Sequence, residues 1–129
     1  MKLEDQVTSL ELSMKLDEIG IDQSDPIFVW YEGILDTEEN MNKDIGCYPR
    51  FKAFTASELA EFLPKQIIKI RKHFIELTYD YECNYEGKPN YYDYYTESDI
   101  CPEYKTQGNE ANYRAEMIIY LHEEGLLKV

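Results

Sequence analysis

The stretch from residue 66 to about residue 96 constrains the fold most, because its residues have the composition and order of β-strands. Residues 67–70 are rich in isoleucine, and residues 75–82 alternate large apolar side chains with polar ones. Such alternation places every second side chain on the same face, which is typical of a half-buried strand. Residues 86–89, Glu-Gly-Lys-Pro, have the composition of a turn, and residues 91–95 follow as a partner strand. The stretch therefore predicts an antiparallel meander.

Helix start and stop signals precede this stretch. Thr8 and Glu11 have the spacing of a capping box, in which each side chain satisfies a backbone N–H of the first helical turn. Gly20 supplies the left-handed residue that ends a helix, and Ile21 can fold back on the last turn. We therefore expect a helix over about residues 9–19. Its apolar stripe consists of Leu12, Leu16 and Ile19.

Two further helices have the same kinds of start and stop signals. Thr55 and Glu58 form a second capping box, and Pro64 ends the helix that follows it. A third helix is expected from near residue 109 to Gly125, which again supplies a left-handed stop. The side chains that this last helix is expected to bury are Ala111, Ala115, Met117, Ile118 and Leu121.

The segment between the first two helices contains one clear strand. Residues 27–31, Ile-Phe-Val-Trp-Tyr, are apolar on both faces, which predicts a strand covered on both sides. Residues 33–46 lose all periodicity and are expected to form a long surface loop. The chain of 129 residues is long enough for one domain of ordinary size. We therefore predict a single α+β domain, residues 1–129, with a mostly antiparallel sheet of about four strands and three flanking helices, in the order α-β-α-β-β-β-α.

The chain is strongly acidic. Its 26 Asp and Glu residues outnumber 13 Lys and Arg, so the formal net charge is −13 and the isoelectric point is about 4.5. Direct binding to DNA or RNA is disfavoured, because nucleic-acid affinity comes mainly from cations that neutralise phosphates. The hydrophobic fraction of 43% separates the chain from acidic disordered sequences. The charge fits a basic protein partner, or it serves solubility alone.

The cysteines and histidines give no metal or catalytic signature. The chain has Cys47, Cys83, Cys101, His73 and His122, none of them at C-x-x-C or H-x-x-x-H spacing. An odd number of cysteines predicts free thiols in a reducing compartment. Because glycine-rich phosphate-binding motifs are also missing, we predict no metal, no cofactor and no catalytic residue. The sequence shows neither a signal peptide nor an apolar run of membrane length, which predicts a cytoplasmic protein without membrane contact.

Tyrosines and acidic residues are interleaved between residues 79 and 95. Tyrosine combines an apolar ring with a polar hydroxyl, and it is enriched in protein interfaces. A ribbon of tyrosines and acids is therefore a candidate surface for gripping a basic protein. The alternative is that the rings form cross-strand pairs, half of them facing the core. The candidate partner-binding residues are Tyr81, Tyr85, Tyr91, Tyr92, Tyr94 and Asp93.

The helical segments carry a resemblance to other proteins. The matching residues are Ser9-Leu10-Glu11-Leu12 through Gly20, Phe54-Thr55-Ala56-Ser57-Glu58-Leu59 with Leu63-Pro64, and Ala111, Arg114-Ala115-Glu116-Met117, Tyr120-Leu121 and Gly125-Leu126. In these residues the chain resembles a family of small uncharacterised proteins from phages, prophages and gut Bacteroidota. The shared positions are caps and core residues, so the resemblance implies a shared fold and carries no activity or catalytic residue. It also implies a mobile-element accessory protein of the bacterial cytoplasm.

Three functions follow as hypotheses. The first is a binding protein without catalysis that occupies a basic site on a protein, for example to inhibit a nucleic-acid-handling host factor. The second is a small-ligand or nucleotide-binding domain with a pocket near Trp30, Tyr31 and Arg114. A charged residue such as Arg114 on a core-directed helix either pairs with an acid or holds an anion. The third is a homodimer joined through exposed tyrosine-rich strands.

Overall fold

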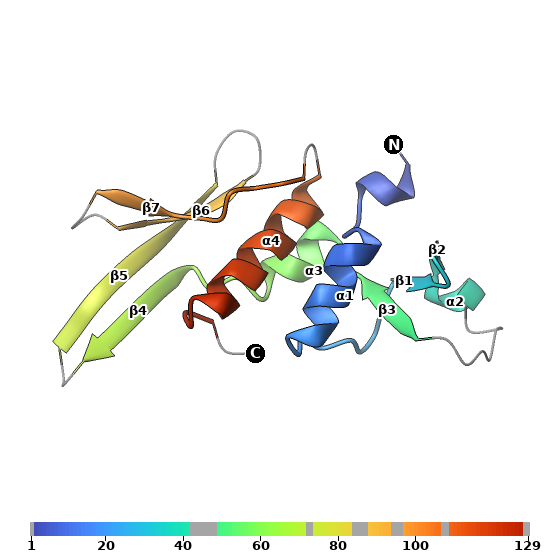
Figure 1. Ribbon diagram of the computed structural model, residues 1–129, viewed down its shortest axis with the longest axis horizontal. Helices are drawn as coiled ribbons and strands as arrows, with labels where there is room; N and C mark the ends of the chain where they lie inside the picture. Colours follow the sequence, from blue (N-terminus) through green and yellow to red (C-terminus); the bar gives the residue numbers. More distant parts are fainter. Residues whose placement is uncertain are drawn as a thin grey trace.

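Most of the helical structure lies between two β-sheets (Figure 1). The four-stranded sheet forms one end of the elongated molecule and the three-stranded sheet lies towards the other. The predicted α+β class with antiparallel sheets is therefore confirmed. The computed structural model describes residues 2–41, 49–71, 74–83, 88–93, 97–106 and 109–127, with the side chains of all but residues 41, 68–71, 74–79 and 83.

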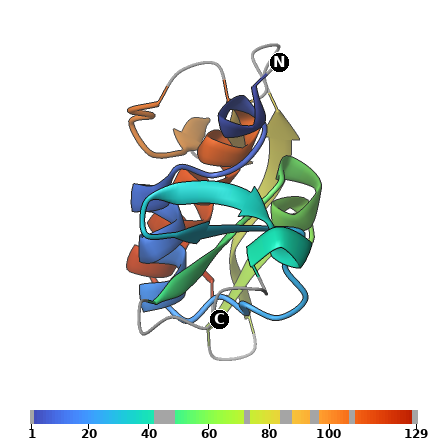
Figure 2. The same cartoon turned by 90° about the vertical axis from the view of Figure 1, so that its right-hand side faces the viewer.

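The three-stranded sheet is built around a tight turn. Its strands are β1 (Phe28–Tyr31), β2 (Ile34–Thr37) and β3 (Arg50–Ala53), in the order β2-β1-β3 and antiparallel. Glu32 and Gly33 connect β1 to β2 with φ angles of 50° and 77°, as in the two-residue hairpin turns whose twist matches that of the strands. Figure 2 looks onto this sheet, with most of the helical structure behind it.

The long surface loop predicted for residues 33–46 is wrong in its first part. β2 lies there, and a short helix, α2 (Glu38–Met41), follows it. Composition alone does not indicate a strand, because only Ile34 and Leu35 of β2 are apolar; the pairing with β1 makes it one. Residues 42–46 of the predicted loop lie outside the described residues.

The four-stranded sheet is a meander. Its strands β4 (Gln66–Arg71), β5 (Phe74–Cys83), β6 (Pro89–Asp93) and β7 (Ser98–Ile100) are each antiparallel to the next. The predicted meander is thus confirmed, and β7 extends it. The described strands form two sheets rather than one, because β1 pairs with its neighbours β2 and β3.

The helices follow the sequence signals closely. They are the short 3-10 helix η1 (Leu3–Asp5), α1 (Leu10–Glu18), α3 (Ala56–Ala60) and α4 (Glu110–Glu123). The capping box of Thr55 and Glu58 at the start of α3 is confirmed, with both reciprocal hydrogen bonds present. Asn109 caps α4, where its side-chain oxygen accepts a hydrogen bond from the Asn112 N–H at 3.1 Å.

The capping box predicted from Thr8 and Glu11 is wrong. Ser9 caps α1 instead, since its hydroxyl oxygen accepts a hydrogen bond from the Leu12 N–H at 3.2 Å. Thr8 is buried, and its hydroxyl oxygen accepts a hydrogen bond from the Phe54 N–H at 3.0 Å. A buried N–H needs a hydrogen-bond partner, so the Thr8 hydroxyl pairs with the Phe54 N–H and Ser9 caps α1.

The two predicted glycine stops are confirmed. Gly20 has a φ of 98°, and the Ile21 N–H donates to the Leu16 carbonyl at 3.0 Å. Gly125 has a φ of 72°, and the N–H of the next residue donates to the Leu121 carbonyl at 2.8 Å. Both helices therefore end in the six-residue hydrogen bond of the Schellman motif.

The main core lies among α1, α3 and α4 and extends to one face of the four-stranded sheet. Residues that are completely buried in it include Leu16, Phe54, Leu59, Tyr91 and Ile118. All five α4 residues that were predicted to be buried are in this core. β1 adds a smaller cluster of Val29 and Tyr31, while Phe28 and Trp30 remain partly exposed. β1 therefore buries one face rather than the two that were predicted.

Candidate functional site

The four-stranded sheet has an inner face on the helices and an outer face away from them. Because side chains alternate along a strand, the register determines which residues share a face. Ile67, Tyr81 and Tyr91 belong to the inner face and contact the main core. The outer face consists, among the described side chains, of Gln66, Asp80, Glu82, Asn90, Tyr92 and Asp99. We call these six residues the acidic sheet face.

One row of the acidic sheet face crosses all four strands and consists of Gln66, Asp80, Tyr92 and Asp99. The Gln66 amide donates to Asp80 Oδ1 at 2.9 Å, and the Asn90 amide donates to Asp99 Oδ1 at 2.9 Å. Both donors are neutral, so these hydrogen bonds orient the carboxylates without cancelling their charge. The row therefore presents a tyrosine ring between two fixed carboxylates.

Only part of the predicted tyrosine surface lies on this face. Tyr92 is there and is half-buried. Tyr91 and Asp93 are only 0% and 2% exposed, because the alternation along β6 turns them inward, so their prediction as partner-contact residues is corrected. Tyr81 packs edge-to-face on Tyr91, with 5.5 Å between ring centroids, and also contacts the core. The predicted residues Tyr85 and Tyr94 lie outside the described residues.

Tyr91 joins the four-stranded sheet to the segment that follows α3. Its hydroxyl donates a hydrogen bond to the Pro64 carbonyl. Burial, with a smaller contribution from Tyr81, raises the pKa of the Tyr91 hydroxyl well above its usual value. The hydroxyl therefore stays a neutral donor at physiological pH, which suits a structural role.

None of the three acids of the acidic sheet face is among the candidate partner-binding residues predicted from the sequence. Asp80 and Glu82 alternate with inward tyrosines, so the signal for their outward position was present. Asp99 lies beyond the stretch of interleaved tyrosines, and only the register of β7 against β6 brings it beside Tyr92. Strand register is set by distant residues, so no local pattern could have placed Asp99.

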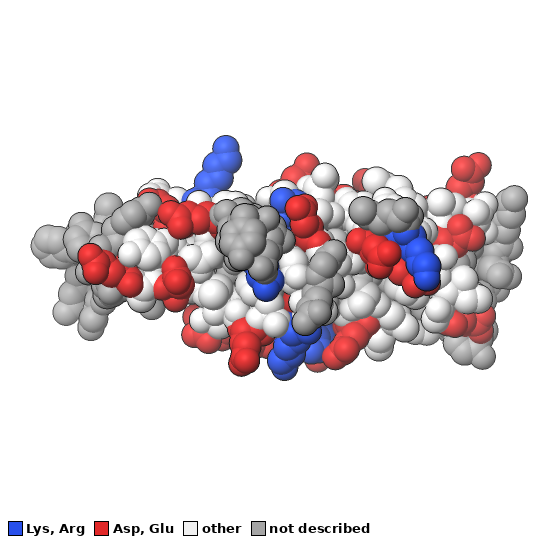
Figure 3. All heavy atoms as spheres, turned by 90° about the horizontal axis from the view of Figure 1, so that it is seen from above, with Lys and Arg blue, Asp and Glu red and all other residues white. Residues whose placement is uncertain are grey.

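Acidic side chains also occur well beyond this sheet. Figure 3 shows them along much of the length of one side of the molecule, with a smaller number of basic side chains among them. Acidic side chains are thus not confined to the acidic sheet face. The net charge of −13 provides long-range attraction for a basic partner, whereas the acidic sheet face adds a defined local arrangement.

Arg114 and Trp30, the two residues predicted to hold a ligand, contact different parts of the fold, and Arg114 is not among the walls of the pocket that Trp30 lines. Arg114 Nη1 donates to the Ala56 carbonyl, so this side chain ties α4 to the start of α3. Its Nε atom is buried without a hydrogen-bond partner in the described part of the chain. Trp30 lies beside α1, where its indole N–H donates to the Thr8 carbonyl at 3.0 Å and its ring lines a small apolar pocket.

A larger surface pocket of about 310 Å³ lies beside α1 and α4. Its wall includes apolar, basic and acidic side chains, among them Leu12, Ile119, Tyr120, Lys15, Lys105 and Glu103. Cys101 also lines it, and burial, followed by the Asp99 carboxylate, raises the pKa of its thiol. A protonated thiol is a poor nucleophile, so Cys101 is not an activated cysteine. The pocket offers room for a ligand rather than a nucleophile.

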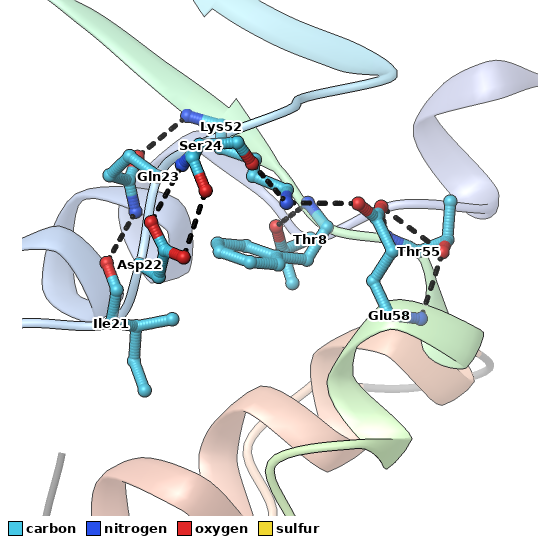
Figure 4. A network of polar contacts seen from close by, with 9 residues as sticks. Thr8, Ile21, Asp22, Gln23, Ser24, Lys52, Thr55 and Glu58 are labelled. Atoms are coloured by element: carbon cyan, nitrogen blue, oxygen red, sulfur yellow. Dashed lines mark hydrogen bonds and ion pairs between the residues drawn. The ribbon is translucent and has the colours of Figure 1, made fainter.

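A polar network joins the three-stranded sheet to α3 (Figure 4). Lys52 Nζ lies 3.1 Å from Glu58 Oε2 and donates to the Ser24 carbonyl at 2.9 Å. The Lys52 side chain is only 10% exposed, and its backbone N–H donates to Gln23 Oε1 at 2.9 Å. Glu58 also accepts the capping hydrogen bond from the Thr55 N–H. Each charged group is engaged by its neighbours, so the network is structural.

The described residues contain no group of three or more His, Cys, Asp and Glu side chains that could hold a metal ion. Within the same residues, no helix has both the length and the apolar character needed to cross a membrane. No family model, curated protein or solved structure matches the chain. Functional conclusions therefore rest on the residues and their geometry.

Proposed function

We propose that this is a non-catalytic binding protein whose acidic sheet face docks on a basic surface of a protein partner. The observation that carries the proposal is the row in which Asp80 and Asp99 flank Tyr92. The carboxylates offer acceptors to Lys and Arg, and the ring offers a large contact area with a polar tip. Because a sheet holds these side chains in register, little conformational entropy is lost when a partner binds.

A basic protein is the partner class that this face supports best. Nucleic acid is repelled by the same carboxylates that attract Lys and Arg. Fixed carboxylates can occupy a protein site that otherwise binds phosphates, so a nucleic-acid-handling factor is the proposed partner. The resemblance of the helical segments to phage, prophage and gut Bacteroidota proteins adds the bacterial cytoplasm as the proposed setting.

Pairing of two copies through the acidic sheet face is disfavoured by the same charges. In a two-fold dimer, each residue of a shared surface faces the same surface of the second copy. Asp80, Glu82 and Asp99 would then lie against their own copies, and like charges in contact destabilise an interface. The face therefore suits a different, basic molecule better than a second copy of the chain.

Affinity capture tests this proposal. The wild-type chain and the Asp80→Asn, Asp99→Asn double variant are immobilised and exposed to a bacterial lysate at low salt, and the retained proteins are identified. We expect the wild type to retain basic proteins that the variant loses and that added salt releases, because salt screens exposed charges. Capture that resists salt, or that is equal on both chains, would exclude the acidic sheet face as the docking surface.

A second candidate function is small-ligand binding in the pocket beside α1 and α4. Its volume of about 310 Å³ favours it, since ligand pockets measure ~300–1,000 Å³. Thermal-shift screening with nucleotides and other metabolites tests it, because a ligand at 100 times its dissociation constant adds ~2.7 kcal/mol of stability. Ile119→Trp should fill the pocket and abolish the shift. A shift that persists in this variant would place the ligand elsewhere.

A further inference from the structure

A separate apolar pocket lies between α1 and the three-stranded sheet. It has a volume of about 170 Å³. Its walls consist of Leu10, Met14, Trp30, Glu32, Gly33, Pro49 and Phe51. We call this the α1–sheet pocket. It shares no residue with the acidic sheet face, which belongs to the sheet on the other side of the helices (Figure 1).

The walls of the α1–sheet pocket are held by regular structure. Leu10 and Met14 are four residues apart and so lie one turn apart on the same side of α1. Trp30 and Phe51 are directly opposite each other in the β1 and β3 pairing. The hydrogen bond from the Trp30 indole to the Thr8 carbonyl further restricts the ring. The pocket is therefore preformed, which lowers the entropic cost of filling it.

Part of the apolar lining of the pocket is not buried by the fold. α1 already buries Leu12 and Leu16 in the main core, on another side of the helix. Met14 in contrast remains 45% exposed, although it lies beside an aromatic pair. Exposed methionine and aromatic side chains around a hollow are typical of surfaces that receive a partner's side chain.

Glu32 gives the rim of this pocket a negative charge. It occupies the first position of the turn between β1 and β2 with a φ of 50°, a conformation that costs a non-glycine residue about 1–2 kcal/mol. Its side chain is exposed. A carboxylate at the edge of an apolar hollow can pair with a cation that flanks an apolar side chain.

We propose that the α1–sheet pocket binds one large apolar side chain from a basic segment of a protein partner, with an adjacent Lys or Arg paired to Glu32. The volume fits one ring, since a cavity of ~150 Å³ lined by apolar side chains holds a benzene molecule. The charge of Glu32 and of the whole chain selects basic flanking residues. This proposal is independent of the acidic sheet face, because neither surface needs the other to be occupied.

Tryptophan fluorescence reports directly on this pocket, since Trp30 is the one tryptophan of the chain. The probes are three capped tripeptides, Lys-Phe-Lys, Glu-Phe-Glu and Lys-Ala-Lys, titrated while Trp30 emission is recorded. We expect Lys-Phe-Lys to change the emission saturably, with affinity about tenfold or more above Lys-Ala-Lys, because the ring is buried on binding. Glu-Phe-Glu should bind more weakly than Lys-Phe-Lys, and added salt should reduce that difference.

Matched variants locate the binding. Met14→Lys places a positive charge in the pocket that repels the lysines of the peptide, so it should abolish the response to Lys-Phe-Lys. Ile27→Lys makes the same change at a residue that is 53% exposed and does not line the pocket, so its response should be unchanged. Glu32→Gln should reduce the preference for Lys-Phe-Lys over Glu-Phe-Glu, and the remaining preference comes from the net charge of the chain.

Three results would overturn the proposal. They are the absence of a saturable response in the wild type, an equal response in Met14→Lys, and equal affinity for all three peptides. The Asp80→Asn, Asp99→Asn variant serves as a further control and should respond like the wild type. Failure of the proposal at the pocket therefore leaves the proposal at the acidic sheet face open to its own test.

Discussion

Tyr91 links the meander to the helical layer through one ring and one hydroxyl. The ring lies against Tyr81 inside the core, and the hydroxyl donates to the Pro64 carbonyl. Because burial raises its pKa, the folded state holds the Tyr91 proton more tightly than the unfolded chain does. Stability from this group is complete below the ordinary tyrosine pKa and is lost as the pH rises above it.

Tyr91→Phe tests that reasoning. At neutral pH the variant should lose about 0.5–1.5 kcal/mol, the value of one hydrogen bond. Above about pH 10 the wild type loses stability as its unfolded chain ionises, so the difference between the two proteins should shrink. Urea unfolding at neutral and alkaline pH measures this. Tyr92→Phe on the outer face serves as the control, and a difference that grows with pH would contradict the account.

Glu58 is the second residue whose environment makes a sharp prediction. Glu58→Gln keeps the size of the side chain but leaves the nearly buried Lys52 ammonium without its anion. We expect a loss of about 1–3 kcal/mol of unfolding free energy by urea titration. The same substitution at Glu11, whose partner Lys15 lies 3.7 Å away on the exposed side of α1, should change it by less than about 0.5 kcal/mol. Equal effects at both sites would show that burial of the Lys52 pair does not matter.

At the scale of elements, the ends of the long helices depend on single left-handed residues. Gly125 ends α4 with a φ of 72°, and a Cβ atom added there meets nothing within 4 Å. The cost of Gly125→Ala should therefore come from the backbone alone, about 1 kcal/mol. Gly125→Asn should cost less, because asparagine tolerates this conformation. Thermal unfolding of the three proteins checks this order, and an alanine variant as stable as the wild type would refute it.

These helix ends explain which parts of the fold the sequence predicts. Thr55, Glu58 and Gly125 satisfy groups only a few residues away, so their patterns are visible locally. The pairing of β1 with β2 and β3 depends on residues farther along the chain, and the composition of β2 and β3 does not indicate strands. Thr8 shows the same limit. Its hydroxyl oxygen accepts a hydrogen bond from the distant Phe54 N–H and therefore does not cap α1.

The candidate site was predictable to a similar extent. Alternation shows that Tyr91 and Tyr92 point to opposite faces, but it does not show which face meets the helices. The structure turns Tyr91 and Asp93 inward and leaves Tyr92 beside Asp80 and Asp99. The sequence suggested a ligand pocket near Trp30 but did not indicate its other walls, because α1 and the β1–β3 pair approach each other only in the folded chain.

At the scale of the whole molecule, the two candidate docking surfaces belong to different sheets, and a layer of helices lies between these sheets (Figure 1). The acidic sheet face offers charge and one tyrosine, whereas the α1–sheet pocket offers an apolar hollow with one carboxylate. Both fit a basic protein, and the net charge of −13 attracts such a partner from a distance. A partner that reaches both surfaces would gain from their combination.

The dissociation constant of the captured partner for the Asp80→Asn, Asp99→Asn variant, relative to the wild type, tests the central claim most directly. Asp17→Asn, Glu18→Gln on the exposed side of α1 is the control, because it removes the same amount of charge away from the face. Calorimetric titration at low salt should show binding weakened about tenfold or more in the first variant and less than about twofold in the control. Equal affinities for the first variant and the wild type, or equal weakening in both variants, would contradict docking through the acidic sheet face.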